Sequence, residues 1–339
     1  MQRVIVREFG GVDCLDLVDE SVPSPGPNEA VVRLTSIGMN HAELMMRRGE
    51  YKIASGDPPF TPGLEGGGIV EAIGESVDTE WVGQRVTLPI DAPRRPRVEG
   101  RINGTYRSHY IIEAARLIRV PEAVPDDALG AIWLPYLTAY GALIWQQAIE
   151  PGQFVLLPAC SSSVAIAASQ IVRDAGGITI GTTTSPAKVE QLLTLPECHY
   201  DHIITTEHDQ WWKAIKLITE GHGIDVAFDP VAAGAFLNTE IRLLADYGSI
   251  WIYGLLGTVG PVDLTPLIRK KARIAGYVNN MLEDAPAQVL TNAYQYILDR
   301  LADGRFKLPI TETFDLSDVR EAHEKMERGS HIGKFILIP

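Results

Sequence analysis

A run of serine hydroxyls follows a short apolar segment near the middle of the chain. The segment Phe154–Leu157 has the pattern of a buried strand, and the turn Pro158–Ser162 leads into Ser163–Asp174, which has helical periodicity. A helix that begins directly after a buried parallel strand offers free amide hydrogens and the positive end of its dipole, which together favour a pyrophosphate group. The serine hydroxyls can add hydrogen bonds to such a group.

The glycine fingerprint of dinucleotide sites is missing from this turn. Ala159, Ser161 and Ala165 stand where the fingerprint would place its glycines. Because their side chains are small, the backbone can still approach a ligand closely. The segment is therefore either a phosphate site or a purely structural tight turn. The candidate contact residues are Ser161, Ser162 and Ser163.

The end of the next predicted strand, Ile178–Ile180, carries hydroxyl groups and a lysine. NAD sites usually place Asp or Glu about 20 residues after the phosphate turn, where the carboxylate holds the ribose diol. Here the segment Gly181–Lys188 has no carboxylate, and its hydroxyls and lysine suit a ribose 2′-phosphate instead. The alternative is that Thr182–Ser185 caps the next helix and the lysine is solvated. The candidate residues are Thr183, Thr184, Ser185 and Lys188.

A third candidate loop follows the predicted strand Ser249–Tyr253. Tyr253, Gly254 and Leu255 stand at the carboxyl end of a parallel strand, where ligands bind in such sheets. An ordinary turn at a strand end is the alternative interpretation.

The elements that must position these loops follow two patterns. From about residue 126 onward, apolar strand segments alternate with amphipathic helices, as far as the strand Ala272–Val278 and the helix Ala287–Ala302. This alternation predicts a doubly wound, Rossmann-like parallel sheet. The first 120 residues or so contain short strand patterns separated by turn residues, with one helix at Ala42–Arg48, and a last strand is predicted at Lys334–Ile338. We therefore expect an α/β protein with a second, mostly β domain.

Composition and charge limit the possible partners. The 339 residues are 45% hydrophobic and 22% charged, as in a soluble globular protein of about two domains. The net charge of −13 argues against nucleic-acid or anionic membrane surfaces. The only basic cluster is interpreted as a solvated loop: Arg94, Arg95, Arg97 and Arg101.

Cellular location is inferred from what the sequence lacks. The three cysteines have neither disulfide-framework nor metal-knuckle spacing, and no uncharged apolar run reaches the roughly 18 residues of a membrane span. The charged, alternating N-terminal segment predicts a strand and not a signal peptide. We expect a cytoplasmic protein with a small-molecule substrate and with no nucleic-acid or membrane partner.

The whole chain resembles the quinone oxidoreductase (ζ-crystallin-like) branch of the medium-chain dehydrogenase/reductase superfamily. The most specific match is the glycine-rich segment Pro59–Gly74, and Gly38–Tyr51 resembles the active-site segment of the family. Four further segments match in the same order along the chain: Leu134–Tyr140, Pro158–Gln170, Asp225–Pro230 and His331–Phe335.

The resemblance implies a domain plan and a cofactor. A GroES-like catalytic domain would comprise residues 1–122 and 303–339, a Rossmann-like NADP(H)-binding domain would comprise residues 123–302, and the active site would lie between them. The resemblance also implies a homodimer that uses the edge of the nucleotide sheet, for which Ala272–Val278 is a plausible edge strand.

The resemblance also nominates individual residues. The amide of Asn40 and the hydroxyl of Tyr51 would hydrogen-bond the substrate oxygen as hydride arrives. The alternatives are that Asn40 is a structural loop amide and that Tyr51 is a wall or surface residue. Thr138 resembles the family threonine near the nicotinamide ribose, and Val164 belongs to the phosphate turn. Lys334 would be either a cofactor contact or a charged edge residue.

Zinc is not expected. Asn40 stands where zinc-dependent members of the superfamily have a cysteine ligand, and Leu64 stands where they have a histidine. Because zinc needs nitrogen and sulfur ligands at suitable spacing, we predict no metal site. Glu43 matches an acidic position of the family, and we expect it to make structural hydrogen bonds.

These expectations describe an enzyme that transfers hydride from NADPH to a quinone or to the β-carbon of an α,β-unsaturated carbonyl without zinc. The alternative enzyme is a 2-enoyl thioester reductase, which uses the same hydride transfer. The alternative of another class is a non-catalytic NADP(H)-binding protein of the crystallin kind, because the altered turn at Cys160 and Ala165 could mark lost turnover.

Overall fold

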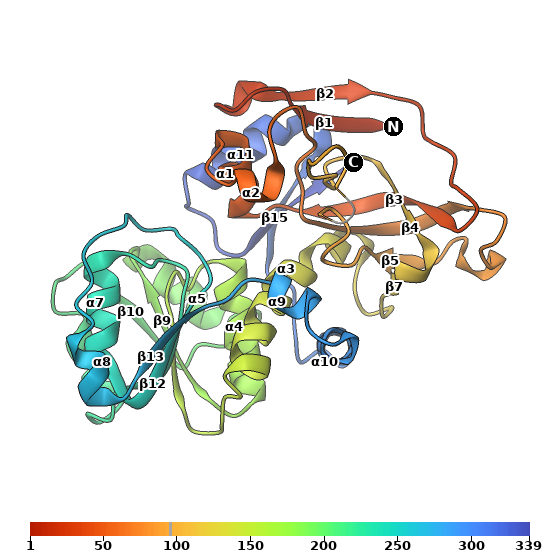
Figure 1. Ribbon diagram of the computed structural model, residues 1–339. Helices are drawn as coiled ribbons and strands as arrows, with labels where there is room; N and C mark the ends of the chain where they lie inside the picture. The colour runs from red at the N-terminus through yellow and green to blue at the C-terminus, as the bar shows by residue number, and fades with distance from the viewer. Residues whose placement is uncertain (95–96) are drawn as a thin grey trace. The chain divides into compact units, whose positions relative to one another are not determined.

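The computed structural model describes residues 1–94 and 97–339, which form two compact units (Figure 1). The first unit comprises Met1–Leu134, Leu301–Gly304 and Ile310–Pro339, and the second comprises Pro135–Arg300 and Arg305–Pro309. The first is mostly β and the second alternates strands with helices, so the expected α/β fold class is confirmed.

Within the described residues, the first unit is built on a seven-stranded sheet in the order β14-β15-β3-β4-β5-β7, with β6 paired to β3. A separate antiparallel pair is formed by β1 (Gln2–Val6) and β2 (Leu15–Asp19). The strands of the larger sheet are β3 (Glu29–Gly38), β4 (Glu65–Ile73), β5 (Arg85–Thr87), β6 (His109–Glu113), β7 (Ile118–Arg119), β14 (Ile310–Asp315) and β15 (Lys334–Ile338).

The glycines that open β4 let it lie unusually close to its neighbours. A Cβ atom on Gly68 would lie 2.0 Å from the carbonyl oxygen of Arg33 on β3. A Cβ atom on Gly67 would lie 2.6 Å from the Cβ atom of Leu129. Since real Cβ atoms do not approach this closely, side chains at these positions would force the strands apart.

The helices of the first unit cover the hydrophobic core of its sheet. They are α1 (His41–Arg48), α2 (Lys52–Ser55) and α11 (Val319–Glu327), and α1 packs against α11. On α1, Leu44 and Met46 are buried, as Ala322 and Met326 are on α11. The left-handed conformation of Gly49, with φ of 79°, ends α1.

The second unit contains a parallel sheet in the order β10-β9-β8-β11-β12-β13. The chain enters at the centre with β8, continues outward to β10, and then returns to β11 before moving out the other way. The strand order therefore reverses between β8 and β11, which confirms the doubly wound sheet. The strands are β8 (Phe154–Leu157), β9 (Ile178–Thr183), β10 (His202–Thr205), β11 (Ile224–Asp229), β12 (Leu244–Ile252) and β13 (Arg273–Gly276).

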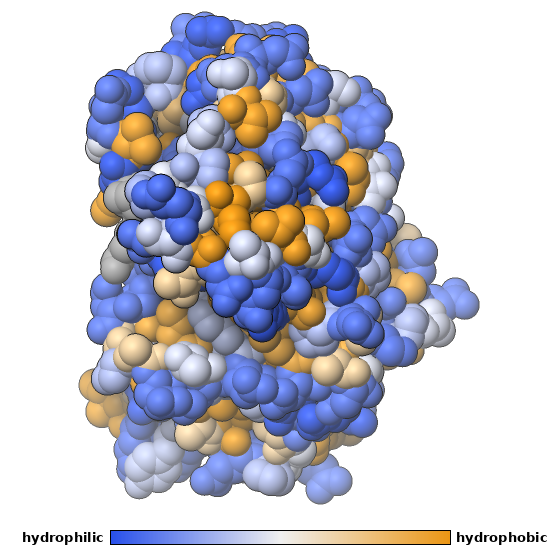
Figure 2. Space-filling view, turned by 90° about the vertical axis from the view of Figure 1, so that its right-hand side faces the viewer, coloured by the Kyte–Doolittle hydropathy of each residue, from blue (hydrophilic) through white to orange (hydrophobic). Residues whose placement is uncertain are grey.

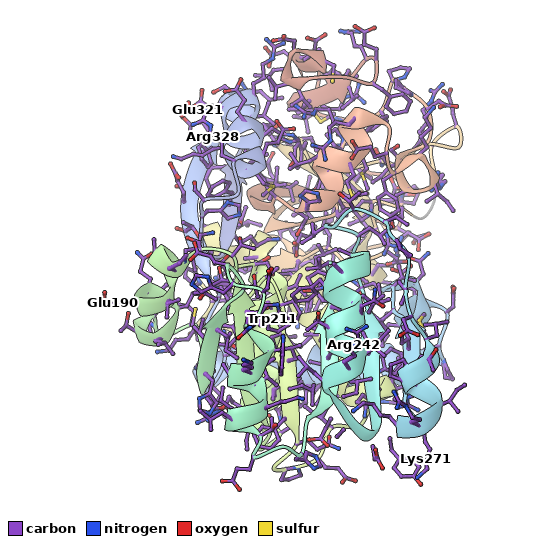
Figure 3. The ribbon with its side chains drawn as sticks, turned by 90° about the vertical axis from the view of Figure 1, so that its left-hand side faces the viewer. Glu190, Trp211, Arg242, Lys271, Glu321 and Arg328 are labelled. Carbon is purple, nitrogen blue, oxygen red and sulfur yellow. The ribbon has the colours of Figure 1, made fainter. Side chains whose placement is uncertain are left out.

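Crossover helices cover both faces of this sheet, with α4 on one side and α7 and α8 on the other (Figure 1). They are α4 (Ser163–Asp174), α5 (Val189–Thr194), α6 (Trp212–Ile218), α7 (Gly234–Leu243) and α8 (Thr265–Lys270), followed by α9 (Asn280–Glu283) and α10 (Ala287–Ala302). Trp211, at the start of α6 (Figure 3), stacks on Phe236 of α7 with ring centroids 5.2 Å apart. The indole thus packs between helices.

Several short elements were not predicted. The strand β2 has one buried residue out of five, so it shows little hydrophobic alternation. The helix α8 has six residues, which is too few to show a helical period. The statement that Ala42–Arg48 is the only helix before residue 120 was wrong, because α2 and three single-turn 3₁₀ helices also lie there. After α3 (Trp133–Ala139), residues 140–146 form a π-helix that no residue pattern indicated.

The basic loop of the first unit is satisfied locally. Arg97 donates to the carbonyl oxygens of Gly100, Ile53 and Ala54, and Arg101 bonds the carboxylate of Glu99. Arg95 lies outside the described residues. On the face seen in Figure 2, hydrophilic residues surround smaller hydrophobic patches. Among the described residues, no helix has both the length and the apolar character needed to cross a bilayer.

Two buried carboxyl groups meet beside the end of β11. The oxygens of Asp229 accept hydrogen bonds from the backbone N–H groups of Val231 and Ala232, at 2.6 and 2.9 Å. Glu240 of α7 is 1% exposed. Burial and the neighbouring charge of Asp229 raise the pKa of Glu240 well above its ordinary value. Glu240 therefore keeps its proton in the folded protein.

We expect Glu240→Gln to stabilise the protein increasingly as pH rises. The pKa of Glu240 is higher in the folded than in the unfolded chain, so only the folded protein retains this proton above the unfolded pKa. The free energy of unfolding then falls by up to about 1.4 kcal/mol per pH unit until the folded pKa is reached. Glutamine keeps the shape of the side chain and has no carboxyl proton to lose, so it removes this fall in the free energy of unfolding.

Urea unfolding near pH 4, 6 and 8 measures the effect. The variant should differ least from wild type near pH 4 and most near pH 8. Glu190→Gln, at an exposed position of α5 (Figure 3), is the control that should follow wild type. Parallel pH profiles for wild type and Glu240→Gln would refute a proton held at this position.

Candidate functional site

The serine-rich turn lies at the carboxyl edge of the parallel sheet, directly after β8. Ala159 adopts a left-handed conformation with φ of 49°, and its carbonyl oxygen accepts a hydrogen bond of 2.8 Å from the amide of Ser162. Ser162 is the N-cap of α4, and its hydroxyl accepts from the amide of Ala165 at 3.2 Å. The following residues, Ser163 and Val164, form the first turn of α4, where helix amides and the dipole attract anions.

Lys188 reaches back to this turn from the loop after β9. Its Nζ atom donates to the hydroxyl of Ser161 over 3.2 Å. The side chain is half-buried, and this burial lowers the pKa of Lys188 from its ordinary value. Candidate residues from two separate loops thus meet, and they place a cation beside the helix N-terminus.

The end of β9 carries hydroxyl groups. The hydroxyl of Thr183 accepts from the amide of Ser185 at 3.1 Å, whereas Thr184 is exposed. A hydroxyl-rich strand end with a neighbouring ammonium fits the 2′-phosphate of NADP(H) better than the free diol of NAD(H).

Tyr253 joins the same region from the end of β12. Its ring stacks on Phe228 of β11, with centroids 3.9 Å apart. Burial and the charge of Asp229 raise the pKa of Tyr253, while the neighbouring Ser162 side chain opposes the rise. Gly254 runs close to β11, since a Cβ atom there would lie 3.0 Å from the carbonyl oxygen of Pro230. The next residue, Leu255, is exposed.

Thr138 lies on α3 and is 8% exposed. Its hydroxyl accepts from the side-chain amide of Asn279 at 3.2 Å. The oxygen of that amide lies 3.3 Å from the hydroxyl of Tyr277, which also donates to the carbonyl of Leu137. Sequence reasoning did not find Asn279, because nothing in the local pattern connects it with a residue so far away in the chain.

The unusual residue Cys160 is accommodated by the neighbouring strand. It is fully buried, and a Cβ atom on Gly181 of β9 would lie only 2.9 Å from the Cβ atom of Cys160. The hydroxyl of Tyr200 donates to the Cys160 carbonyl over 2.8 Å. Burial raises the pKa of the Cys160 thiol to about 12, so the sulfur stays protonated and unreactive.

In the first unit, Asn40 caps the start of α1. Its backbone N–H donates to Glu43 Oε2 over 2.8 Å. Its side-chain nitrogen lies 3.3 Å from Glu43 Oε1 and 3.4 Å from the carbonyl oxygen of Gly38. Glu43 Oε1 also accepts from the amide of Leu64 at 3.0 Å. Glu43 therefore makes the structural hydrogen bonds expected of it and joins the two segments.

Glu43 is a buried carboxyl group with an unusual proton affinity. Burial raises its pKa to about 7, and the positive charge of Lys334 together with the hydrogen bonds from the Glu43 backbone and the Asn40 side chain limits the rise. The group can therefore change its protonation state near neutral pH.

Lys334 lies at the centre of this cluster. Its ammonium contacts Asn40 Oδ1 at 2.6 Å, Glu65 Oε1 at 2.7 Å and the carbonyl oxygen of Met39 at 3.1 Å. Its side chain is fully buried, on a strand that lies between β14 and β3. The interpretation of Lys334 as an edge residue was therefore wrong. Sequence reasoning overlooked Glu65. The available signal was its position, because it is a carboxylate within an otherwise apolar, glycine-rich segment.

Tyr51 stands at the start of α2 and is half-buried against the core of the first unit. Among residues 1–94 and 97–339, its hydroxyl has no hydrogen-bond partner. Of the two nominated substrate-binding groups, Asn40 makes bonds at both ends of its amide, whereas Tyr51 makes none within the described part of the chain.

Comparison with known proteins covers the chain from end to end. The alcohol dehydrogenase GroES-like domain family matches residues 26–122, and the zinc-binding dehydrogenase family matches residues 198–337. The rat synaptic vesicle membrane protein VAT-1 homolog is 27% identical over 358 residues, covering 100% of this chain and 84% of the relative. The quinone oxidoreductase of Pongo abelii is 29% identical over 342 residues, covering 100% and 98%.

Two further similarities concern proteins named for a reaction or a cofactor. The 2-haloacrylate reductase of a Burkholderia species is 26% identical over 350 residues, covering 100% of this chain and 99% of the relative. The crystal structure of Escherichia coli quinone oxidoreductase complexed with NADPH superimposes with a TM-score of 0.86 at 25% identity, covering both chains completely.

The residues of this chain do not fit a zinc site. In the part of the chain that the structure describes, no three His, Cys, Asp or Glu side chains gather to hold a metal ion. The positions that resemble zinc-ligand positions hold Leu64, which is apolar, and Asn40, whose oxygen accepts from Lys334. The ammonium of Lys334 lies among these groups and would repel a second cation.

We expect purified protein to contain no stoichiometric zinc. Glu43 Oε1, Glu65 Oε2 and Asn40 Oδ1 accept hydrogen bonds from N–H groups of this chain. Elemental analysis after dialysis measures the metal, and activity before and after treatment with a chelator shows whether any is needed. One zinc per chain, with activity lost to the chelator and restored by zinc, would contradict this prediction.

Proposed function

The chain belongs to the quinone oxidoreductase branch of the medium-chain dehydrogenase/reductase superfamily, and from this membership we propose that it uses NADPH to reduce a quinone or an α,β-unsaturated carbonyl without zinc. Its first unit carries the GroES-like fold and its second the Rossmann-like fold. The proposal includes a small-molecule substrate and a cytoplasmic location.

The contact between Lys188 and Ser161 carries this proposal. It places an ammonium and a serine hydroxyl next to the first turn of α4, at the carboxyl edge of the sheet. Together with Ser162, Ser163 and Val164, these groups would hold the phosphates of NADPH. The hydroxyls of Thr183, Thr184 and Ser185 would complete the 2′-phosphate site. The remaining candidate contacts for the cofactor are Thr138, Tyr253, Gly254 and Leu255.

The first unit supplies the groups that would act on the substrate oxygen. The bound cofactor supplies the hydride. Tyr51 has a hydroxyl without a partner among the described residues, and the amide hydrogens of Asn40 are held only by long contacts of 3.3 and 3.4 Å, so both groups can donate to a carbonyl oxygen that gains negative charge. The proton that completes the reduction would come from Tyr51 or from water.

Lys334 is not among the proposed phosphate contacts. Its buried ammonium donates to Met39 O and Asn40 Oδ1 and forms an ion pair with Glu65, all within the first unit.

Turnover with a panel of acceptors tests the reaction. We expect oxidation of NADPH by simple quinones or enones, monitored by the loss of cofactor absorbance. Turnover only with enoyl thioesters would transfer the function to that alternative class of reductase. Tight binding of NADPH with no turnover on any acceptor would indicate a non-catalytic nucleotide-binding protein.

We expect NADPH to be preferred over NADH by roughly ten- to a hundredfold in kcat/KM, since a charge-assisted contact to phosphate contributes about 1.5–3 kcal/mol. Lys188→Ala should raise the KM for NADPH and leave that for NADH nearly unchanged. Added salt should weaken the preference, because the lysine is only half-buried.

Lys213→Ala, which removes an exposed lysine from α6, is the matched control and should leave both KM values unchanged. Equal wild-type kcat/KM values for the two cofactors would overturn the assignment. So would a Lys188→Ala variant that loses both cofactors equally.

We also expect a homodimer. The strand β13 is the last strand of the parallel sheet, and its outer edge is free to pair with a second copy. The segment between β12 and β13 exposes the apolar side chains of Val259, Leu264 and Ile268. Exposed apolar groups beside a free strand edge favour a partner surface.

Light scattering at micromolar concentration should give twice the chain mass. Ile268→Glu should shift the mass toward the monomer, whereas Leu217→Glu on α6, whose wild-type side chain is equally exposed at 81%, should not. A monomeric wild type would refute the dimer.

A further inference from the structure

The ammonium of Lys334 is held within the first unit by three groups. It is fully buried, donates hydrogen bonds to Met39 O and Asn40 Oδ1, and forms an ion pair with Glu65. The two shorter contacts, 2.6 and 2.7 Å, are those to the amide oxygen of Asn40 and to the carboxylate of Glu65.

The surroundings prevent the ammonium from moving. Glu65 is itself anchored, because its second oxygen accepts from the amide of Leu134 at 2.9 Å. Gly38 closes the other side, where a Cβ atom would lie 2.6 Å from the Cε atom of Lys334 and 2.0 Å from the carbonyl oxygen of Gly130. The lysine is therefore confined between fixed backbone and a fixed carboxylate.

This arrangement determines which way the amide of Asn40 points. Its oxygen faces the ammonium of Lys334, and its nitrogen faces Glu43 Oε1 at 3.3 Å. Turning the amide over would set its N–H groups against the ammonium and its oxygen against the carboxyl of Glu43. Both contacts would become unfavourable, so the charges on either side select one orientation.

We propose that Lys334 is a positioning residue that orients and polarises the amide of Asn40 for the substrate oxygen, which rests on the proposed function of this site. A hydrogen bond from a cation to the amide oxygen withdraws electron density from the amide nitrogen and strengthens its N–H donors. The buried ammonium thus acts on the substrate through an intervening amide. It provides a fixed positive charge at a place where the described residues offer no cluster of metal ligands.

A double-mutant cycle distinguishes this positioning role from a purely structural role of Lys334. Lys334→Met removes the charge at similar size, and Asn40→Ala removes the amide. If Lys334 acts through Asn40, Lys334→Met lowers kcat by roughly ten- to a hundredfold with little change in the KM for NADPH. The double variant is then no slower than Asn40→Ala alone. Multiplicative losses from the two substitutions would overturn the proposal.

Lys325→Met is the matched control for the kinetics. Lys325 forms an ion pair with Glu312 in the same unit but is partly exposed. This variant should keep the wild-type kcat. Thermal unfolding of all variants records how much stability each loses. If Lys334→Met does not fold, Lys334→Gln serves in its place, since it keeps two N–H donors and removes the charge.

A spectroscopic readout tests the proposal without turnover. The chain has seven asparagines, so selective ¹⁵N-asparagine labelling of the full chain gives few side-chain amide signals, and the pair from Asn40 is the one lost in Asn40→Ala. Lys334→Met should shift this pair and speed its hydrogen exchange, while Lys325→Met leaves it unchanged.

The two readouts distinguish the possible failures. An unchanged Asn40 signal in folded Lys334→Met overturns the positioning role even in an active enzyme. The other outcome is a shifted Asn40 signal in a protein that fails to oxidise NADPH with every acceptor tested. That result supports the control of the amide by Lys334 and refutes only the proposed reaction.

Discussion

The buried ion pair between Lys334 and Glu65 is the interaction on which the first unit depends. Through the Lys334 ammonium and the Glu65 carboxylate it joins the last strand, the loop before α1, the start of β4 and the start of α3. Taking two charges out of water is costly, and removing one partner of such a pair typically destabilises a protein by about 3–5 kcal/mol. The pair is therefore better understood as fixing one arrangement of these segments than as a source of net stability.

The second unit is organised by a different constraint, namely the reversal of strand order between β8 and β11. Because the strands are parallel, the turn after β8, the loop after β9 and the end of β12 lie at one edge of the sheet. Ser161 and Lys188 meet there although they come from two separate loops. A dinucleotide site can therefore form without the glycine fingerprint, because the topology supplies the convergence.

The sequence was sufficient to predict the parallel sheet and the serine-rich turn, because these are local patterns. It was not sufficient for contacts between distant segments. Lys334 lies almost 300 residues from Asn40, and no periodicity reports that its strand is an inner one. The partnership of Thr138 with Asn279 and that of Glu240 with Asp229 are of the same kind. A buried polar residue shows that a partner must exist without naming it.

Cys160 and Gly181 illustrate how a departure from a common motif constrains a second position. The side chain at position 160 occupies space that any side chain at position 181 would need. A cysteine in the turn therefore requires a glycine on β9, and a side chain at 181 would require position 160 to become smaller. The two positions can change only together, so a substitution that is harmless in a relative with a smaller residue in the turn would be disruptive in this chain.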